Sequence, residues 1–466
     1  MLFSSLEFLY LFLPITLLLY FAAPQCARNA VLLVVSLVFY GFGEPIYLFL
    51  MIFTIVTDAV LGLAIERSVR RGRSPRGWLI VAIAANLSLL GFFKYYDFFA
   101  HTVGLPTLGL ALPIGISFYT FQALSYVIDV ARREVAAQRD LIRFGAYVTL
   151  FPQLIAGPIV RYSEIETQLK ERTHTLSRVA DGMATFCVGL SKKVLFANAA
   201  GELCEALLVR LFEPTLRTAL GAWLWLVMFS AQIYFDFSGY SDMAVGLGRI
   251  FGFELPQNFR YPYISRSITE FWRRWHITLS SWFREYVYIP LGGNRRGRAR
   301  TVRNLLITWA LTGLWHGAAW NFLLWGVYFF ALLSLEKFVW GKRLERAPSV
   351  FQHTYALFFI LLGWLIFASD GTRVMDGISL GGALVGIGCV SFSDGIVFYE
   401  LVRFLPLLGA MVLGATPLPR TLFYKIADEH PSLAGAMRVL LCLASLLVCT
   451  AYLVDSGYNP FLYFRF

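Results

Sequence analysis

The chain has 466 residues, of which 58% are hydrophobic and 17% are aromatic, and its formal net charge is +11. A water-soluble domain of this composition would lack polar surface, so the sequence predicts a membrane protein with several spanning segments. The arginine clusters that carry much of the positive charge lie between apolar segments, which is typical of short cytoplasmic loops and argues against nucleic acid as a partner.

A spanning helix needs about 20 mostly apolar residues. We therefore expect an all-α polytopic membrane protein with roughly 11 to 13 embedded segments, some of them re-entrant. No fixed repeat or low-complexity tract is visible, so one membrane domain over residues 1–466 is predicted. The candidate segments lie at 5–23, 29–42, 46–65, 78–99, 112–130, 141–160, 180–208, 219–250, 304–336, 352–369, 376–393, 399–415 and 434–454.

The first segment indicates how the chain is oriented. It carries Glu7 and no basic leader, so we expect a retained helix rather than a secretory signal. No basic residue precedes Arg28, which favours an N-terminus outside the cytoplasm. The expected cytoplasmic loops contain Arg67, Arg70, Arg71, Arg73 and Arg76 in one cluster and Arg295, Arg296, Arg298, Arg300 and Arg303 in the other.

The six cysteines are scattered, mostly within apolar stretches, and none belongs to a C-x-x-C pair. Their spacing predicts neither a disulfide framework nor a zinc site, so no bound metal is expected. The cysteines are Cys26, Cys187, Cys204, Cys389, Cys442 and Cys449.

Several apolar segments carry charged side chains. Segment 78–99 contains Lys94 and Asp97, and "YFDFSGYSDMAVGLG" contains Asp236 and Asp242. Charged groups survive at membrane depth only where protein or a wet cavity surrounds them. We therefore expect a helical ring that encloses a polar path, in which such residues line the path or pair with one another.

The stretch "SITEFWRRWHITLSSWFREYVYIPLGG" is predicted to form one helix with two faces. Because Trp and Tyr favour the membrane interface, we expect a partly submerged helix that presents His276 to the enclosed path. Its aromatic face comprises Trp272, Trp275, Leu279, Trp282 and Tyr286, and its polar face comprises Thr269, Arg273, His276, Ser280 and Arg284.

Residues 304–336 are predicted to form a long apolar helix with His316 in its middle. His316 belongs to a polar stripe, because residues four apart lie nearly above one another on a helix. Gly313 and Gly317 leave room for another helix or a substrate to approach the backbone. An ionisable group at membrane depth is by default a candidate for function. The stripe comprises Asn304, Thr308, Thr312, His316 and Trp320.

A neutral imidazole is a good base near pH 7, which suits removal of a proton from a hydroxyl as it attacks an acyl carbon. The sequence has no G-x-S-x-G elbow, no H-E-x-x-H pair and no cysteine beside a histidine. Acyl transfer assisted by histidine therefore remains open. The alternative is a structural hydrogen bond between helices, worth about 0.6–2 kcal/mol, and it has more weight for His276 than for His316.

Several stretches resemble the membrane-bound O-acyltransferase family. They are "LPIGISFYTFQALSYVIDV" (112–130), "FPQLIAGPIVRY" (151–162), "GLSKKV" (189–194), the block that runs from "YFDFSGYSDM" to "IPLGGNRRG" (234–297), "LWHGAAWNF" (314–322) and "NPFLYFRF" (459–466). The resemblance implies a ring of helices around a thinned centre with funnels to both faces. It also implies that His316 of W-H-G is the principal catalytic residue and that His276 of R-R-W-H is its polar partner.

The members that the chain resembles most acetylate exported bacterial polysaccharides such as alginate, and close relatives transfer D-alanine to cell-wall polymers. The resemblance thus implies an acetyltransferase of the bacterial inner membrane that uses a cytoplasmic thioester, acetyl-CoA or an acyl carrier protein, and holds no permanent cofactor. His316 would accept the hydroxyl proton, and His276 would orient a substrate or stabilise an oxyanion. Expected partners are membrane lipid, a periplasmic acetyltransferase and a cytoplasmic donor or carrier protein. Candidate residues of the substrate path are Asn304, Thr308, Thr312, Trp315, Asn321, Asp236, Tyr240, Asp242 and Arg273.

Two other interpretations remain open from the sequence. The charges in the apolar segments are compatible with a transporter or flippase, although paired inverted repeats of broken helices are not evident. The arginine clusters are compatible with a scaffold that recruits peripheral enzymes, and solvated cytoplasmic loops explain them equally well. Consumption of acyl groups by the purified protein would separate an enzyme from a carrier.

Overall fold

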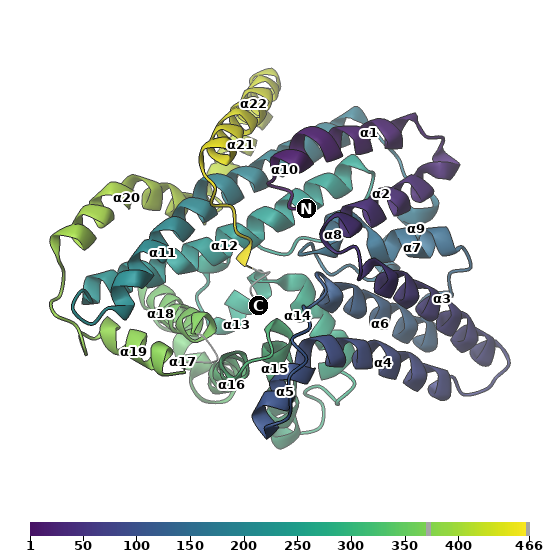
Figure 1. Cartoon of the computed structure of the whole chain (residues 1–466), viewed down its shortest axis with the longest axis horizontal. Helices are drawn as coiled ribbons and strands as arrows, with labels where there is room; N and C mark the ends of the chain where they lie inside the picture. Colours follow the sequence, from purple (N-terminus) through teal and green to yellow (C-terminus); the bar gives the residue numbers. More distant parts are fainter. Residues whose placement is uncertain (370–373, 463–466) are drawn as a thin grey trace. The chain divides into compact units, whose positions relative to one another are not determined.

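The computed structural model describes residues 1–369 and 374–462 and folds them into helices (Figure 1). No β-strand occurs in these two ranges, where an isolated bridge joins Thr218 and Ser391. Eight of the helices in this part of the chain are long and apolar enough to cross a membrane. The predicted all-α polytopic class is therefore confirmed.

The chain divides into two compact units. Unit 1 consists of Met1–Cys187 and Tyr240–Pro256, and unit 2 consists of Val188–Gly239 and Gln257–Phe466. Helices α10 (Leu176–Ser191) and α12 (Ala219–Ile250) contribute residues to both units. The single domain predicted for residues 1–466 and the ring implied by the resemblance stay predictions.

Unit 1 contains the N-terminal helices. They are α1 (Leu13–Ala22), α2 (Arg28–Gly43), α3 (Leu48–Arg70), α4 (Arg76–Leu90), α5 (Tyr96–Val103), α6 (Ile116–Arg132), α7 (Leu141–Thr149), α8 (Phe151–Leu154) and α9 (Tyr162–Lys170). Helix α6 packs against α3 and α4, and α2 packs against α7 (Figure 1). A Cβ at Gly62 of α3 would lie 2.7 Å from the hydroxyl oxygen of Tyr126 in α6, so this glycine permits the close packing of the two helices.

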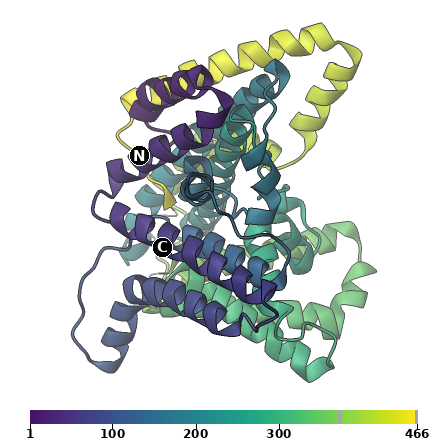
Figure 2. The ribbon, with the colours of Figure 1, turned by 90° about the vertical axis from the view of Figure 1, so that its right-hand side faces the viewer.

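Unit 2 contains His276 and His316. Its helices are α11 (Ala199–Phe212), α13 (Ile268–Arg274), α14 (Ile277–Phe283), α15 (Arg298–His316), α16 (Trp320–Leu335), α17 (Gly341–Glu345), α18 (Ser349–Ala368), α19 (Val374–Leu384), α20 (Gly395–Gly414), α21 (Leu418–Glu429) and α22 (Pro431–Asp455). Helices α21 and α22 pack together as the C-terminal hairpin, coloured yellow in Figure 2. Helix α16 packs closely against α15 and also against α18.

Short stretches of other helical types extend or connect these helices. The π-helical stretches are Phe8–Phe12, Gly91–Tyr95, Lys192–Asn198, Arg284–Tyr288 and Glu336–Trp340, and the 3-10 turns are Gln25–Ala27 and Pro262–Ile264. Widened π turns occur frequently at functional sites. The stretch that contains Lys193 is relevant to the site described below.

The candidate spanning helices account for much of the predicted membrane region. They are Gln25–Gly43, Leu48–Arg70, Arg76–Val103, Ala219–Ile250, Trp320–Glu345, Ser349–Ala368, Gly395–Gly414 and Pro431–Asp455. Several other predicted segments are shorter than a full span, among them 5–23, which contains the helix Phe8–Ala22. Helix α6 has 17 residues, and the segment 141–160 is divided into α7 and α8. Proline favours the first turn of a helix because it lacks an N–H, and Pro152 lies at the start of α8.

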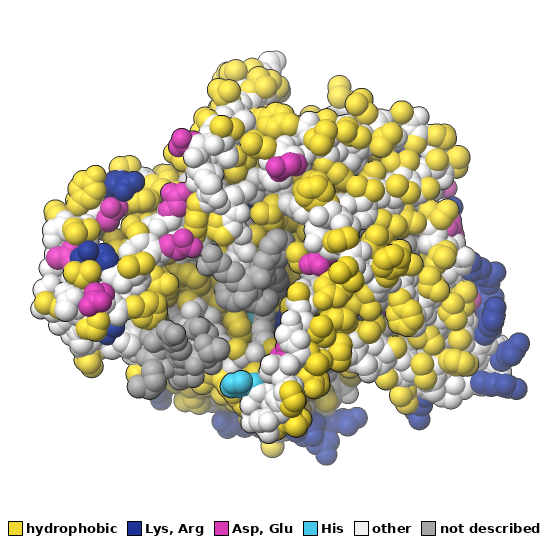
Figure 3. Space-filling view, viewed as in Figure 1, with side chains coloured by type: hydrophobic (Ala, Val, Ile, Leu, Met, Phe, Trp, Pro, Cys, Tyr) yellow, Lys and Arg dark blue, Asp and Glu magenta, His cyan; other side chains and the backbone are white. Residues whose placement is uncertain are grey.

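The surface of the molecule is rich in exposed hydrophobic side chains, as expected for a protein that contacts lipid. Hydrophobic side chains cover much of the face seen in Figure 3, and Phe49 and Leu447 on candidate spans are each 74% exposed. Lysine and arginine side chains gather along the lower and right-hand edges of the same view. The arginines of both predicted loop clusters are exposed. Several of them belong to the ends of helices α3, α4 and α15 rather than to loops.

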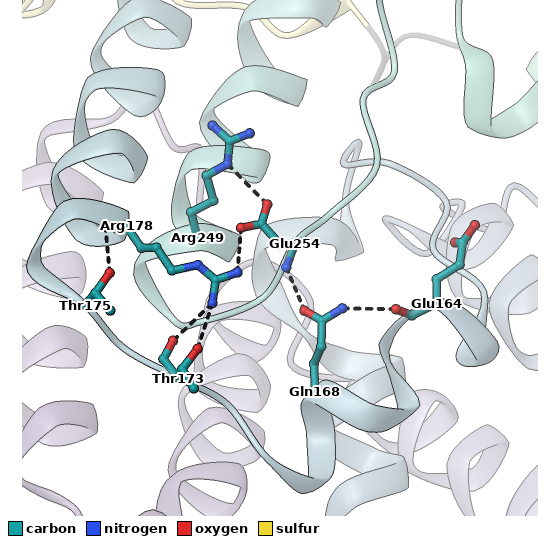
Figure 4. Close-up of polar contacts among 7 residues, drawn as sticks. All are labelled: Glu164, Gln168, Thr173, Thr175, Arg178, Arg249 and Glu254. Carbon is teal, nitrogen blue, oxygen red and sulfur yellow. Dashed lines mark hydrogen bonds and ion pairs between the residues drawn. The ribbon is translucent and has the colours of Figure 1, made fainter.

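A polar network in unit 1 fixes the segment that follows α12 (Figure 4). The carboxylate of Glu254 pairs with Arg178 at 2.9 Å and with Arg249 at 3.4 Å. The backbone N–H of Glu254 donates to the side-chain oxygen of Gln168 in α9 at 2.7 Å. Because the ion pairs are partly exposed, each stabilises the fold by about 0–1 kcal/mol. Their main effect is to hold the ends of three helices together.

Candidate active site

His316 is the last residue of α15, and the prediction that it lies in the middle of a continuous helix is wrong. After His316 the chain becomes extended at Gly317, and α16 begins at Trp320. A Cβ at Gly317 would collide with the ring of Phe322, and one at Gly313 would collide with the carbonyl of the same residue. The two glycines therefore permit the close approach of α16, a segment that the sequence had placed in the same helix as His316. Trp320 is half exposed and does not continue the stripe.

The remaining residues of the stripe on α15 are buried. Asn304, Thr308, Thr312 and His316 are 0%, 9%, 7% and 7% exposed. The hydroxyls of Thr308 and Thr312 donate to the carbonyls one turn earlier, each at 2.8 Å. Asn304 donates to the carbonyls of Leu291 and Gly293 at 3.2 and 2.9 Å. These three side chains thus satisfy backbone groups, and their place in a substrate path stays a prediction.

The His316 side chain borders a narrow cavity within unit 2. The cavity measures about 20 Å³, which holds roughly one water-sized molecule. A substrate group can therefore occupy it only if lining side chains move. The cavity is lined by Ile233, Asp236, Phe237, Trp275, His316, Trp325, Trp364, Phe367, Phe461 and Leu462.

Aromatic rings hold the imidazole of His316 from several sides. Its centroid lies 5.1 Å from Trp325 and 5.4 Å from Phe367, in both cases nearly edge to face. Trp315 lies 5.1 Å from His316 and 5.8 Å from His276 and is buried. This arrangement favours one orientation of the ring. It also gives His316 a poorly hydrated environment, in which electrostatic interactions are stronger than in water.

A buried ion pair lies beside this cavity. Lys193, in the π-helical stretch Lys192–Asn198, lies 2.7 Å from Asp236 of α12, and the two side chains are 2% and 3% exposed. The Lys193 ammonium also donates to Asn198 at 2.8 Å and to the carbonyl of Pro460. Asp236 accepts the backbone N–H of Leu462 at 2.8 Å. Asp236 therefore lines the cavity and is paired at the same time.

The C-terminal segment completes one wall of the cavity. The chain turns back after α22 (Figure 1), and Asn459 contacts Asn198 at 3.3 Å. Phe461 and Leu462 line the cavity. Of the motif "NPFLYFRF", residues 459–462 have this role, and residues 463–466 lie outside the described residues.

The chain breaks at His276, so the prediction of one continuous helix around it is wrong. Helix α13 ends at Arg274, α14 begins at Ile277, and His276 has φ 42° and ψ 55°. This left-handed conformation costs about 1–3 kcal/mol in a residue other than glycine. Residues 258–260 satisfy the freed backbone groups. Arg260 N–H donates to the Arg274 carbonyl at 2.9 Å, and Ile277 N–H donates to the Asn258 carbonyl at 3.0 Å.

The predicted aromatic face is buried within the protein, and its place at the membrane interface stays a prediction. Its residues are Trp272, Trp275, Leu279, Trp282 and Tyr286. His276 is 1% exposed, with its ring 4.8 Å from Phe237 and perpendicular to it. Arg273 is exposed. His276 does not itself line the cavity, whereas its neighbours Trp275 and Phe237 do.

The pKa of His276 is lowered well below its usual range, mainly because the ring is buried and to a smaller extent because His316 is nearby. His276 lies outside the candidate spanning helices. The neutral form of its imidazole is therefore favoured.

The other candidate path residues lie in two environments. Asn321, at the start of α16, donates to the carbonyl of Phe367 at 3.1 Å and so joins α16 to α18. Tyr240 and Asp242 belong to unit 1, where the ring of Tyr240 stacks on Phe3 at 4.4 Å. Their assignment to a substrate path stays a prediction.

Three buried polar residues of unit 2 were not singled out from the sequence. They are Lys193, Asn258 and Glu336. Glu336 is 7% exposed and accepts the first backbone N–H groups of α13, from Ile268 at 2.6 Å and Thr269 at 2.8 Å. It thus satisfies a helix end from a different helix. The sequence signals for these residues were weak. Lys193 lies in "GLSKKV", Asn258 lies in the block 234–297, and Glu336 follows a long apolar run.

Comparison with known proteins places these features in context. Residues 130–368 match the model of the membrane-bound O-acyltransferase family. A probable alginate O-acetylase of Azotobacter vinelandii and another of Pseudomonas putida are each 38% identical to the chain, and each match covers 100% of both proteins. A peptidoglycan O-acetyltransferase of Helicobacter pylori is 35% identical over 84% of this chain and 81% of that protein. The matched range includes α13, α14, α15 and both histidines.

Proposed function

The chain belongs to the membrane-bound O-acyltransferase family and is an acyltransferase, and from this premise we propose that it moves an acetyl group from a cytoplasmic thioester to a hydroxyl, in support of O-acetylation of an exported polysaccharide. The relatives that match over their full length are named for alginate. A further relative is named for peptidoglycan. Hydroxyl groups of carbohydrate polymers are thus the acceptor class that these names share.

This proposal rests mainly on the position of His316. Its imidazole lies at a helix end, is nearly buried, and borders a cavity whose other walls are largely aromatic. A neutral imidazole in that position can take the proton of a hydroxyl while the oxygen attacks the carbonyl carbon of the thioester. The carbon–sulfur bond then breaks, the ester remains on the acceptor, and the proton passes to the thiolate.

Transfer of an acetyl group from a thioester to a hydroxyl requires a donor and an acceptor, which we expect to approach from opposite sides of the membrane. Acetyl-CoA or an acylated carrier protein would supply the thioester from the cytoplasm, where the exposed arginine loops are expected to lie. No cofactor held permanently by the chain is required. A periplasmic acetyltransferase would take the acetyl group onward to the polymer, and the bacterial inner membrane is the location in which both sides are accessible.

Purified protein in lipid vesicles is expected to consume an acetyl thioester and to form an acetyl ester on a soluble oligosaccharide or on the periplasmic partner. The measurement is transfer of labelled acetyl from acetyl-CoA or from an acetylated carrier protein, each offered separately. Vesicles without protein give the background rate of hydrolysis. Movement of the oligosaccharide across the vesicle membrane without loss of the thioester would instead support a carrier.

Replacing His276 with alanine is expected to slow acyl transfer by about 10²-fold, because loss of an orienting group allows substrate misplacement on the scale of an ångström. The initial rate with saturating donor is the measurement. His353→Ala is a suitable control, since His353 is only partly buried and contacts the carbonyl of Ser265 at 3.3 Å. An unchanged rate in the His276 variant would leave that histidine with a structural role alone.

A further inference from the structure

The side-chain oxygen of Asn258 receives three buried contacts. Thr278 approaches it with its backbone nitrogen at 3.3 Å and with its hydroxyl at 3.0 Å. The Nδ1 atom of His276 lies 3.0 Å from the same oxygen. Asn258, His276 and Thr278 are 2%, 1% and 7% exposed, so water does not compete strongly for these bonds.

The backbone contact determines which end of the Asn258 amide faces His276. A backbone N–H can only donate, so the atom that it meets must be an acceptor, which is the amide oxygen rather than the amide nitrogen. That oxygen can only accept. His276 must therefore carry its proton on Nδ1 in order to bond to it.

A neutral imidazole has one N–H, so a proton on Nδ1 leaves Nε2 with an unshared electron pair. The Nε2 atom of His276 is buried and has no hydrogen-bond partner among residues 1–369 and 374–462. Phe237, Phe259 and Trp315 surround the ring. An uncharged ring suits this environment, because burial disfavours the imidazolium.

We propose that Asn258 is a positioning residue that fixes His276 in the Nδ1–H tautomer, so that His276 enters the reaction as a hydrogen-bond acceptor at Nε2. This inference rests on the proposed function and divides the roles of the two histidines. A neutral His276 in this tautomer cannot donate to an oxyanion. It can accept a bond from an O–H or N–H group, such as a hydroxyl of the incoming acceptor, and so orient it beside His316.

The tautomer is measurable without turnover. Protein labelled with ¹⁵N in histidine and held in lipid vesicles is expected to give, near neutral pH, a protonated Nδ1 and an unprotonated Nε2 for one ring. The His276→Gln variant removes that signal and so assigns it. A protonated Nε2 with an unprotonated Nδ1 would overturn the proposal.

Variants of Asn258 separate its effect on the tautomer from an effect on folding. Asn258→Asp keeps an accepting oxygen and should keep the proton on Nδ1. Asn258→Leu removes it, should shift the proton toward Nε2, and should slow acyl transfer about 10²-fold, as expected for the loss of His276. Thr278→Val is the matched control, because it removes one bond to the same oxygen without touching His276.

The possible results distinguish this inference from the function on which it rests. A proton that stays on Nδ1 in Asn258→Leu, or an unchanged rate of acyl transfer in that variant, would contradict the assignment of Asn258. A wild-type protein that shows the expected tautomer but transfers no acyl group would leave the role of Asn258 in setting the tautomer intact and would overturn the proposed function.

Discussion

Replacing His316 with alanine is expected to slow acyl transfer by about 10²–10⁴-fold, which is the usual contribution of a positioned general base. Without the imidazole, the hydroxyl must attack the thioester while it still carries its proton. The loss should fall on kcat, because the base acts in the transition state more than in substrate binding. The measurement is the initial rate of ester formation with both substrates saturating.

The controls for this prediction distinguish lost chemistry from lost structure. His316→Gln keeps a polar side chain of similar length but removes its basicity, so it should be about as slow as the alanine variant. His101→Ala makes the same change at an exposed position of α5 and should leave the rate unaltered. Normal acyl transfer by His316→Ala, at an equal amount of protein in the membrane, would refute the assignment of His316 as the base.

The polar stripe of α15 could be predicted because it depends only on helical periodicity. A spacing of four residues places side chains on one face of any helix that contains them. All four residues of this stripe, Asn304, Thr308, Thr312 and His316, are buried. The end of this helix also had a local signal, since glycine directly after the last helical residue is a common stop. Because the residues beyond Gly317 are also apolar, one helix was predicted to continue to residue 336.

The break at His276 had no such signal. Residues 268–283 contain neither glycine nor proline, and the two helices that flank the break have the same pattern of apolar residues as one continuous helix. The break is stabilised by Asn258 and Arg260, which satisfy backbone groups that a helix would otherwise pair internally. Only the folded chain brings those residues to His276. The buried state of His276 could therefore not be read from its own helix face.

Lys193 and Asp236 pair with each other and both contact the C-terminal segment. These contacts could not be predicted from the sequence, for a related reason. Asp236 and Leu462 are 226 residues apart in the chain. Contacts between residues so far apart along the chain leave no periodic pattern in the sequence. Asp236 was expected either to line a path or to pair with another charge. In the structure it pairs with Lys193 and lines the cavity beside His316, and its place in a substrate path stays a prediction.

Replacing Lys193 with methionine is expected to lower the free energy of unfolding by about 3–5 kcal/mol, because it leaves the carboxylate of Asp236 buried without its partner. The change also removes the bonds to Asn198 and to the carbonyl of Pro460, so the C-terminal wall of the cavity should loosen. The measurements are the midpoint of thermal unfolding in detergent and the rate of acyl transfer. Both should fall together.

An exposed ion pair provides the matched control. Lys170 lies 2.6 Å from Glu166 in α9 and is 50% exposed, so Lys170→Met should change stability by about 0–1 kcal/mol. The double variant Lys193→Met with Asp236→Asn removes both buried charges, and it should recover much of the stability that the single variant loses. If Lys193→Met were as stable as Lys170→Met, the buried pair would not hold the C-terminal segment. Recovery of stability without recovery of acyl transfer would instead indicate that the charge of Asp236 itself is needed at the cavity.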